Sequence, residues 1–517
     1  MNAFAVFPLN GSLRSMICAV LAASICGCEV GPDYIPPWTA VPTYYKEIEG
    51  WKPIQPLDAI DRGDWWLIYE DPILDRLERQ VEVSNQNIAM FEAAYHQSVA
   101  LVQQARAALF PVFGLTYNAI RTHEGPAAVR AQSIGNIGTF AKGFTDNVIT
   151  LETTATWDID VWGRVRRMIE SNAANAQSNA ADIANARLSA QAQLAMAYFN
   201  LRAADSLKSL LNRLAHEFRR TQTITENQYK QGTVSRYDVV TAQAQVRSTE
   251  AQAIGVDVQR AQFEHAIALL IGVPPAQLYI PRGALATTVP YIPPDFPAAL
   301  LERRPDIAAA ERSIETQSAL IGVAAAAYFP DISTSDFIGW IGSKAFPISV
   351  ANEVWQVGGT ATEILFNGGL RRAQLAGAEA SYYRAVATYR QTVLTAFQQV
   401  EDALSSLRIL AKQAPVQQDA VRLSREAVRV SVNAYKAGTV AFTAVVTAEQ
   451  TLIANEQTAL TIRQNRFIAS VNLIQALGGG WHVSELPTYD ELRHWRSCVD
   501  VIGSIRGEIP PGLPPCL

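Results

Sequence analysis

The feature that most constrains this chain is a long stretch free of helix-breaking residues. No proline occurs between Gly163 and Pro274, and the 66 residues from 164 to 229 contain no glycine either. An α-helix rises 1.5 Å per residue, so one helix over this stretch would be about 100 Å long. Globular helices average three to four turns, so a helix of this length needs neighbours along its whole course. The stretch therefore predicts a helix over 164–229 in a coiled coil or a packed helical tube.

The end of this helix is one of two copies of a short motif. YKQGTVSRYDVVTAQ begins at Tyr229 and YKAGTVAFTAVVTAE begins at Tyr435, with nine of fifteen positions identical. Gly232 stands where a helix C-terminus favours a left-handed residue. Ser235, with Asp238 three residues later, is typical of a new helix start. Each copy is therefore predicted to be the turn of a helical hairpin, from which a helix returns over 236–271 or 442–478.

Two segments of alternating polarity precede each long helix. In NVITLETTATWDIDVW the residues of one parity are mostly apolar, and those of the other are Thr, Glu or Asp. Segments of this length with period two and aromatic ends are the weak signature of outer-membrane barrel strands. The second half repeats this order with blurred alternation, and its long helix contains Pro415, where a kink is expected. We predict strands at about 111–121, 147–161, 330–341 and 353–366, and a second long helix over 370–435.

Four strands per chain have a consequence for assembly. A membrane barrel needs at least eight strands, and open strand edges are not tolerated in lipid. An oligomer is therefore implied. Two copies would supply eight strands and three would supply twelve, and strand spacing alone does not decide between them.

The first thirty residues have the pattern of an export signal. Arg14 precedes a short apolar run that cannot span a bilayer and that ends in ICGC. This ending resembles a bacterial lipobox in which Cys28 would take a diacylglycerol, although Cys26 stands where alanine or serine is usual. Cleavage by the ordinary signal peptidase is the alternative. Glu29, in place of an aspartate after the cysteine, favours the outer membrane.

Other residue types point away from metal, nucleotide and nucleic-acid chemistry. The net charge is −5 and Lys and Arg form no cluster, which gives no reason to expect nucleic acid. The six histidines lack metal-ligand spacing, and neither a phosphate loop nor a nucleophile elbow occurs. We expect no metal, no catalysis and no cofactor besides the lipid on Cys28. Cys498 and Cys516 could form a disulfide in an oxidising periplasm, but the sequence leaves their distance open.

Seven motifs in a fixed order carry a family resemblance over nearly the whole mature chain. They are CEVGPDYIPP, DWWLIYEDPILDRLERQ, WDIDVWGRVRR, LLERRPDIAAAER, AAYFPDIS, LFNGGLRRAQ and LGGGW. They resemble the TolC-like outer membrane factors, in the lipoprotein branch that includes nodulation protein T and the outer-membrane components of tripartite efflux pumps. The resemblance implies a mainly α fold with a membrane β-barrel: a homotrimer whose 12-stranded barrel continues into an α-helical barrel across the periplasm. It also implies a passive duct, not an enzyme, that works with a periplasmic adaptor (membrane fusion protein) and an inner-membrane pump of the resistance-nodulation-division type.

The motifs and the duplication together predict six regions. They are a lipoprotein signal peptide (1–27), an extended N-terminal tail (28–70), a first repeat (71–273), a proline-rich linker (274–299), a second repeat (300–479) and a C-terminal equatorial tail (480–517).

The resemblance assigns a role to the two hairpin tips, 230–235 and 436–441. By that resemblance they ring the periplasmic entrance of the duct and contact the adaptor. A turn with only a folding role is the alternative. The predicted docking residues are Gly232, Thr233, Val234, Gly438, Thr439 and Val440.

Control of the entrance is where this chain departs from the family. Relatives often carry acidic residues on the inward face of the second returning helix, but here Ala444 and Thr447 stand at those positions. Thr443 stands where some relatives have a leucine constriction, and the first acid of this helix is Glu449. The first copy keeps Asp238, so we expect polar control of the mouth to rest on that copy, unless Asp238 only stabilises its helix N-terminus. The gate candidates are Asp238, Arg236, Tyr237, Thr443 and Thr447.

Two other functions share many of these features. A secreted coiled-coil scaffold would have long helices but no need for amphipathic strands. A type I protein-secretion duct would look nearly the same, although members of that group usually lack a lipobox. The lipobox therefore favours the export of drugs or metabolites.

Overall fold

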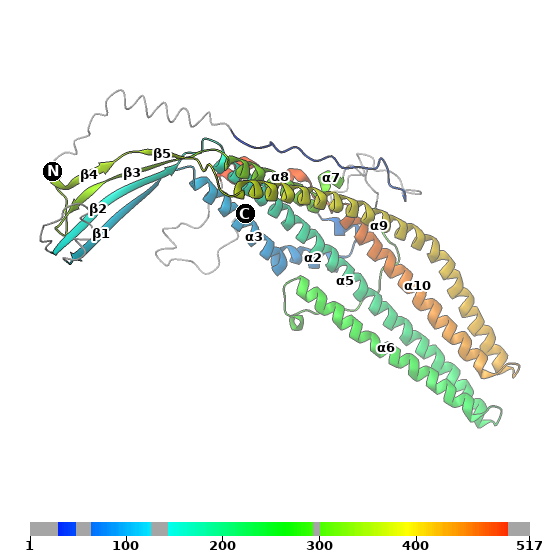
Figure 1. The fold of residues 1–517 in the computed structure, drawn as a ribbon. Coiled ribbons are helices and arrows are strands. Elements are labelled where there is room, and N and C mark those ends of the chain that lie inside the picture. Colours follow the sequence, from blue (N-terminus) through cyan, green and yellow to red (C-terminus); the bar gives the residue numbers. More distant parts are fainter. Residues whose placement is uncertain (1–28, 48–63, 126–142, 293–299, 495–517) are drawn as a thin grey trace.

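The computed structural model describes residues 29–47, 64–125, 143–292 and 300–494. Within them the chain is elongated, with a β-sheet at one end and paired helices that extend to the other (Figure 1). The signal peptide, Cys28, Cys498 and Cys516 lie outside the described residues, so the predictions of a lipid and of a disulfide stay predictions.

The two halves of the chain have the same order of elements. The first contains α2 (Pro72–Ser84), α3 (Gln86–Ala107), β1 (Val112–Glu124), β2 (Phe144–Asp158), α5 (Arg164–Lys230) and α6 (Arg236–Leu270). The second contains α7 (Leu300–Arg303), α8 (Pro305–Ala326), β3 (Asp331–Gly342), β4 (Glu353–Gln356), β5 (Gly359–Thr362), α9 (Leu370–Lys436) and α10 (Phe442–Ala476). Short 3-10 helices lie at Trp65–Tyr69 (η2), Pro275–Gln277 (η3), Val350–Asn352 (η5) and Val483–Glu485 (η6), and α11 spans Tyr489–His494.

The two long helices end within a residue of their predicted bounds. Both α5 and α9 contain 67 residues. α9 continues through Pro415, and Figure 1 shows it curving along its length. Each of these helices starts after a glycine with a positive φ, Gly163 and Gly369.

The strand predicted for 353–366 is divided and shorter than expected. β4 and β5 both pair with β3 in one register. Between them the Asp336 carboxylate accepts the backbone N–H of Gly358 at 2.9 Å, while the Ser335 N–H donates to the Gly358 carbonyl at 3.2 Å. A side chain thus takes a bond of the strand ladder, and the prediction of one unbroken strand was wrong.

The antiparallel sheet has the strand order β1-β2-β3-β4, with β5 also on β3. Its register aligns apolar side chains on one face: Tyr117 lies opposite Leu151, and Leu151 lies opposite Trp340. The other face pairs Asn118 with Thr150. Successive side chains of a strand point to opposite faces, so the sheet has a mainly apolar face and a mainly polar face, although β3 adds Phe337 and Ile341 to the polar one. The wall of a membrane barrel also has two such faces.

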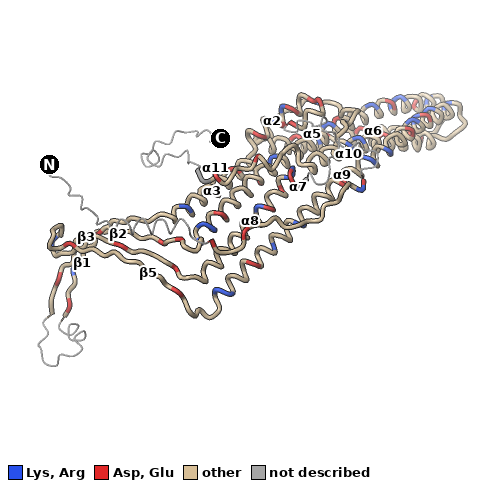
Figure 2. Tube along the Cα trace, turned by 90° about the horizontal axis from the view of Figure 1, so that it is seen from above, with Lys and Arg blue, Asp and Glu red and all other residues tan. Residues whose placement is uncertain are grey.

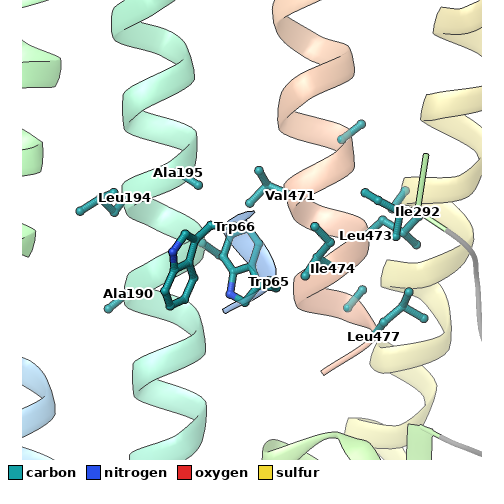
Figure 3. Close-up of a cluster of buried hydrophobic side chains, with 14 of the residues drawn as sticks. Trp65, Trp66, Ala190, Leu194, Ala195, Ile292, Val471, Leu473, Ile474 and Leu477 are labelled. Atoms are coloured by element: carbon teal, nitrogen blue, oxygen red, sulfur yellow. The ribbon is translucent and has the colours of Figure 1, made fainter. Parts of the chain in front are cut away.

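Four helices continue this wall in the order α6, α5, α10, α9 (Figure 1). α3 and α8 pack against α5 near the sheet. Halfway along, the buried Trp65 and Trp66 of η2 lie between α5 and α10 in the main apolar cluster (Figure 3). Acidic and basic residues are interspersed along the helices (Figure 2). No described helix is both long enough and apolar enough to cross a bilayer.

Candidate functional site: the hairpin tips and the seam above them

The first tip is a glycine turn. Gly232 has φ 74°, in the left-handed region, and its N–H donates to the Tyr229 carbonyl at 2.9 Å. The backbone N–H and the hydroxyl of Thr233 both donate to the Gln228 carbonyl, at 3.0 and 2.9 Å. A Cβ at Gly232 would meet nothing within 4 Å. Glycine is therefore favoured here by backbone conformation and not by lack of space.

The second tip repeats the same bonds. Gly438 has φ 73° and donates to the Tyr435 carbonyl at 2.9 Å. The N–H and hydroxyl of Thr439 donate to the Ala434 carbonyl at 3.0 and 2.9 Å. The Gly-Thr pair of each predicted docking motif thus closes the turn, which is the folding role named as the alternative; adaptor contact stays a prediction.

The two returning helices begin differently. The Ser235 hydroxyl accepts the Asp238 N–H and the Asp238 carboxylate accepts the Ser235 N–H, both at 3.3 Å, which is a reciprocal capping box. In the second copy Ala441 has no side chain to cap α10, and its carbonyl accepts the Ala444 N–H at 3.0 Å. Asp238 therefore stabilises a helix N-terminus in this structure, and a gating role would come in addition to that.

The two tips of one chain contact each other. Tyr435, Phe442 and Val445 form an apolar cluster with Ala242 of α6, and Val234 packs against it. The rings of Tyr435 and Phe442 lie 5.1 Å apart. Val234 is thus partly buried between the two hairpins, whereas the other residues of both predicted docking motifs are exposed.

Above the tips, α5 and α10 meet along what we call the seam. Both oxygens of the buried Glu456 of α10 are bound, one by Arg213 of α5 and the other by Arg425 of α9, each at 2.6 Å. Farther from the tips, the Gln464 amide donates to the Asn200 side chain at 2.6 Å. Glu456 therefore fastens three helices, and both repeats, at one point.

Glu449 lies on the same seam, nearer the tips, in a different environment. Its side chain is 2 % exposed and its Oε1 has no hydrogen-bond partner. Burial raises its pKa to about 7, Glu217 of α5 raises it as well, and a hydrogen bond from Thr221 opposes them. The sequence showed only that Glu449 is the first acid of its helix; no local pattern indicates that it is buried.

The exposed face of α10 is uncharged near the tips. The gate candidates Thr443 and Thr447 lie on it, and the stripe continues through Thr451, Thr458 and Thr461. The Thr447 hydroxyl donates to the Thr443 carbonyl at 2.9 Å, and the later threonines make the same bond to the carbonyl four residues before. The candidates of the first copy, Arg236 and Tyr237, are also exposed. Among the described residues no cluster of three His, Cys, Asp or Glu side chains could hold a metal.

The start of the described N-terminal tail lies where the sheet meets the helices. The Val30 N–H donates to the Trp162 carbonyl at 3.1 Å. Arg167, 4 % exposed, binds Asp33 of the tail at 2.8 Å and Glu170 of its own helix at 2.7 Å. No local pattern indicates that this arginine is buried, since its motif WGRVRR indicates only a helix start.

Comparisons with known proteins agree with this architecture. The sequence profile of a family described as "Outer membrane efflux protein" matches residues 77–273 and 296–479. The chain is 26% identical over 478 residues to a probable efflux pump outer membrane protein, TtgC, of Pseudomonas putida, covering 92% of this chain and 96% of that protein. It is 28% identical over 402 residues to nodulation protein T of Rhizobium leguminosarum bv. viciae, covering 75% and 78%.

A solved structure shares the fold. The outer-membrane channel OprN superimposes with a TM-score of 0.80 at 27% identity, over 88% of this chain and 100% of that one. The likeness therefore extends to the sheet, the long hairpins and the segments between them.

Proposed function

The chain belongs to the outer membrane efflux protein family, and we propose that it is the passive duct of a tripartite pump that exports small molecules. It is an outer-membrane efflux channel. An adaptor in the periplasm and an inner-membrane pump of the resistance-nodulation-division type would deliver the substrate to it. The observation that carries the proposal is the shape of the protomer: a two-faced wall with two open edges.

The sheet leaves one strand edge free on each side. β1 lies at one end of the strand order, and β4 with β5 lies at the other. Neither edge can face lipid unpaired. Because the strands alternate in direction, β1 of one copy can pair antiparallel with β4 and β5 of the next.

The helical wall also has two apolar edges. On α9, Ile409, Val416, Leu423 and Val430 are all more than half exposed and recur every seventh residue, the spacing of a coiled-coil seam. On α6, Val240, Ile254 and Val258 are exposed. Figure 1 shows β1 and α6 on one side of the protomer and β4, β5 and α9 on the other.

Edges of this kind join head to tail and close into a ring. Three copies would supply the twelve strands that the resemblance implies. The apolar face of the sheet would then face lipid and the polar face would face water. We therefore propose a homotrimer whose helical wall forms a periplasmic tube.

The tips would dock the adaptor. Gly232 and Thr233 of the first tip and Gly438, Thr439 and Val440 of the second are exposed at the far end of the molecule. The shared Gly-Thr turn would offer the adaptor six similar surfaces in a trimer. Asp238 would contribute to closing the mouth, because the exposed threonine stripe of α10 contains no acid that could do so.

A lipid on Cys28 would anchor the protein beside the barrel. Val30, two residues after this cysteine, is bonded at the junction of sheet and helices, which is where the inner leaflet would meet the barrel. A diacylglycerol attached to Cys28 would therefore reach the inner leaflet without an additional linker.

The experiment that tests the function is deletion of the gene with complementation. We expect a several-fold loss of resistance to a panel of small toxic compounds, and recovery with the wild-type chain. An unchanged panel together with lost proteins in the exported proteome would replace the proposal with a protein-secretion duct.

A further inference from the structure

The seam between the two hairpins changes character along its length. Glu456 is held by two guanidinium groups. Glu449 lies seven residues closer to the tip, about 10 Å along the helix. It is equally buried, yet none of the ion pairs among the described residues includes it.

The groups around Glu449 do not compensate a negative charge. From α5, the Thr221 hydroxyl faces it, and Glu217 is the charged group that acts on it. On α9, Arg425 is bound by Glu456, and the exposed Arg429, one turn closer to the tip, is bound by Glu426. An ionised Glu449 would thus be a buried charge without a cation, close to a second carboxylate, which is costly. A neutral Glu449 is tolerated.

Little else holds the hairpins together between Glu449 and the tips. The apolar contact there is the small cluster of Ala242, Tyr435, Phe442 and Val445, against which Val234, Val432 and Val446 pack. Separation of α10 from α5 at this end would therefore expose few apolar side chains.

We propose that Glu449 is a proton-operated latch: neutral, it lets α10 lie against α5 down to the tips, and ionised, it separates the two helices between Glu449 and the tips. The separation is a property of the protomer. Only its meaning as an opening of the duct rests on the proposed function.

The test is a distance measurement on the full-length protein in lipid nanodiscs. Cys498 and Cys516 are replaced by serine, and nitroxide labels are placed on cysteines at the exposed Asn227 of α5 and Gln450 of α10. A shift of the carboxyl pKa from 4.5 to about 7 makes separation about 30-fold more favourable at pH 8.5 than at pH 5.5. Electron–electron distances should therefore lengthen as the pH rises.

Three variants separate the latch from other causes. Glu449→Gln should keep the short distance at both pH values. Glu456→Gln should lengthen the distance at both pH values and leave its dependence on pH unchanged. The exposed Glu426→Gln should behave as wild type. Equal wild-type distances at both pH values, or a wild-type response in Glu449→Gln, would overturn the latch. If the distances shift as expected but the protein conducts no ions in a planar bilayer, the proposed function fails and the latch stands.

Discussion

At the scale of single residues, two glycines with the same conformation serve different purposes. Gly232 has φ 74° and open space around it. Gly272 has φ 69°, but a Cβ there would overlap the carbonyl group of Ser84 at the end of α2. The first position needs only a left-handed backbone, whereas the second also needs the absence of a side chain, because another segment passes against it.

We expect Gly232→Ala to cost about 1 kcal/mol, the strain of a left-handed alanine. Gly272→Ala should cost at least ~3 kcal/mol, because the backbone must also move. Thermal melting of the two purified variants compares them directly. An equal loss of melting temperature in the two variants would mean that α2 can shift away from Gly272 without cost.

Glu449 makes stability depend on pH in a defined direction. Its pKa is higher in the folded protein, about 7, than the usual 4.5, so the folded state binds the proton more tightly. The stability it contributes is complete below about pH 4.5 and is lost as the pH rises through 7, by about 3 kcal/mol. Glu449→Gln should therefore melt like the wild type at pH 4.5 and at a higher temperature at pH 8. Glu426→Gln is the control, and a gain of equal size there would contradict the assignment to burial.

At the scale of elements, the two hairpins share a turn but differ in how the returning helix begins. α6 has the Ser235 and Asp238 capping box and α10 has alanines at both positions. Asp238 thus has a structural role that any test of gating must separate from a role of its charge.

A pair of variants makes that separation. Ser235→Ala removes half of the capping box, at a cost of about 1 kcal/mol, and keeps the charge of Asp238. Asp238→Ala removes the other half of the capping box together with the charge. If the charge closes the mouth, single-channel recordings should show a larger closed-state conductance in Asp238→Ala and not in Ser235→Ala. The same conductance in wild type and Asp238→Ala would reduce Asp238 to a helix cap.

At the scale of the whole molecule, the protomer is a wall with two open edges. In the proposed homotrimer, its strand edges and the apolar edge of α9 would contact another copy of the chain. The strands and the long helical hairpins set the length of the protomer, and its two edges would set how copies join.

A charge on the α9 edge should disrupt assembly. Leu423→Asp places a carboxylate in the centre of the proposed contact, where it would lose its hydration. We expect the trimer fraction to fall at least tenfold in native mass spectrometry. Thr458→Asp, on the uncharged exposed face of α10, is the control and should assemble normally. A stable trimer of Leu423→Asp would place the contact elsewhere.

Much of this architecture was predictable because it is written in local patterns. The absence of glycine and proline gave the bounds of α5 to within one residue, and the repeated glycine marked both tips. The period of two indicated the strands of the first repeat. It failed for 353–366, because the Asp336 side chain, on a neighbouring strand, takes the N–H of Gly358.

The sequence by itself determined which segments are helices and strands, where they turn, and that the chain is built twice. These properties depend on residues within a few positions of one another. Only the tertiary structure decided that Glu449 is buried without a cation while Glu456 is clamped, that Arg167 holds the N-terminal tail, and that Val234 faces the other hairpin. The burial and charge balance of these side chains are set by segments far from them in the sequence, as Arg213 of α5 is from Glu456, and no local spacing encodes which segment will lie against them.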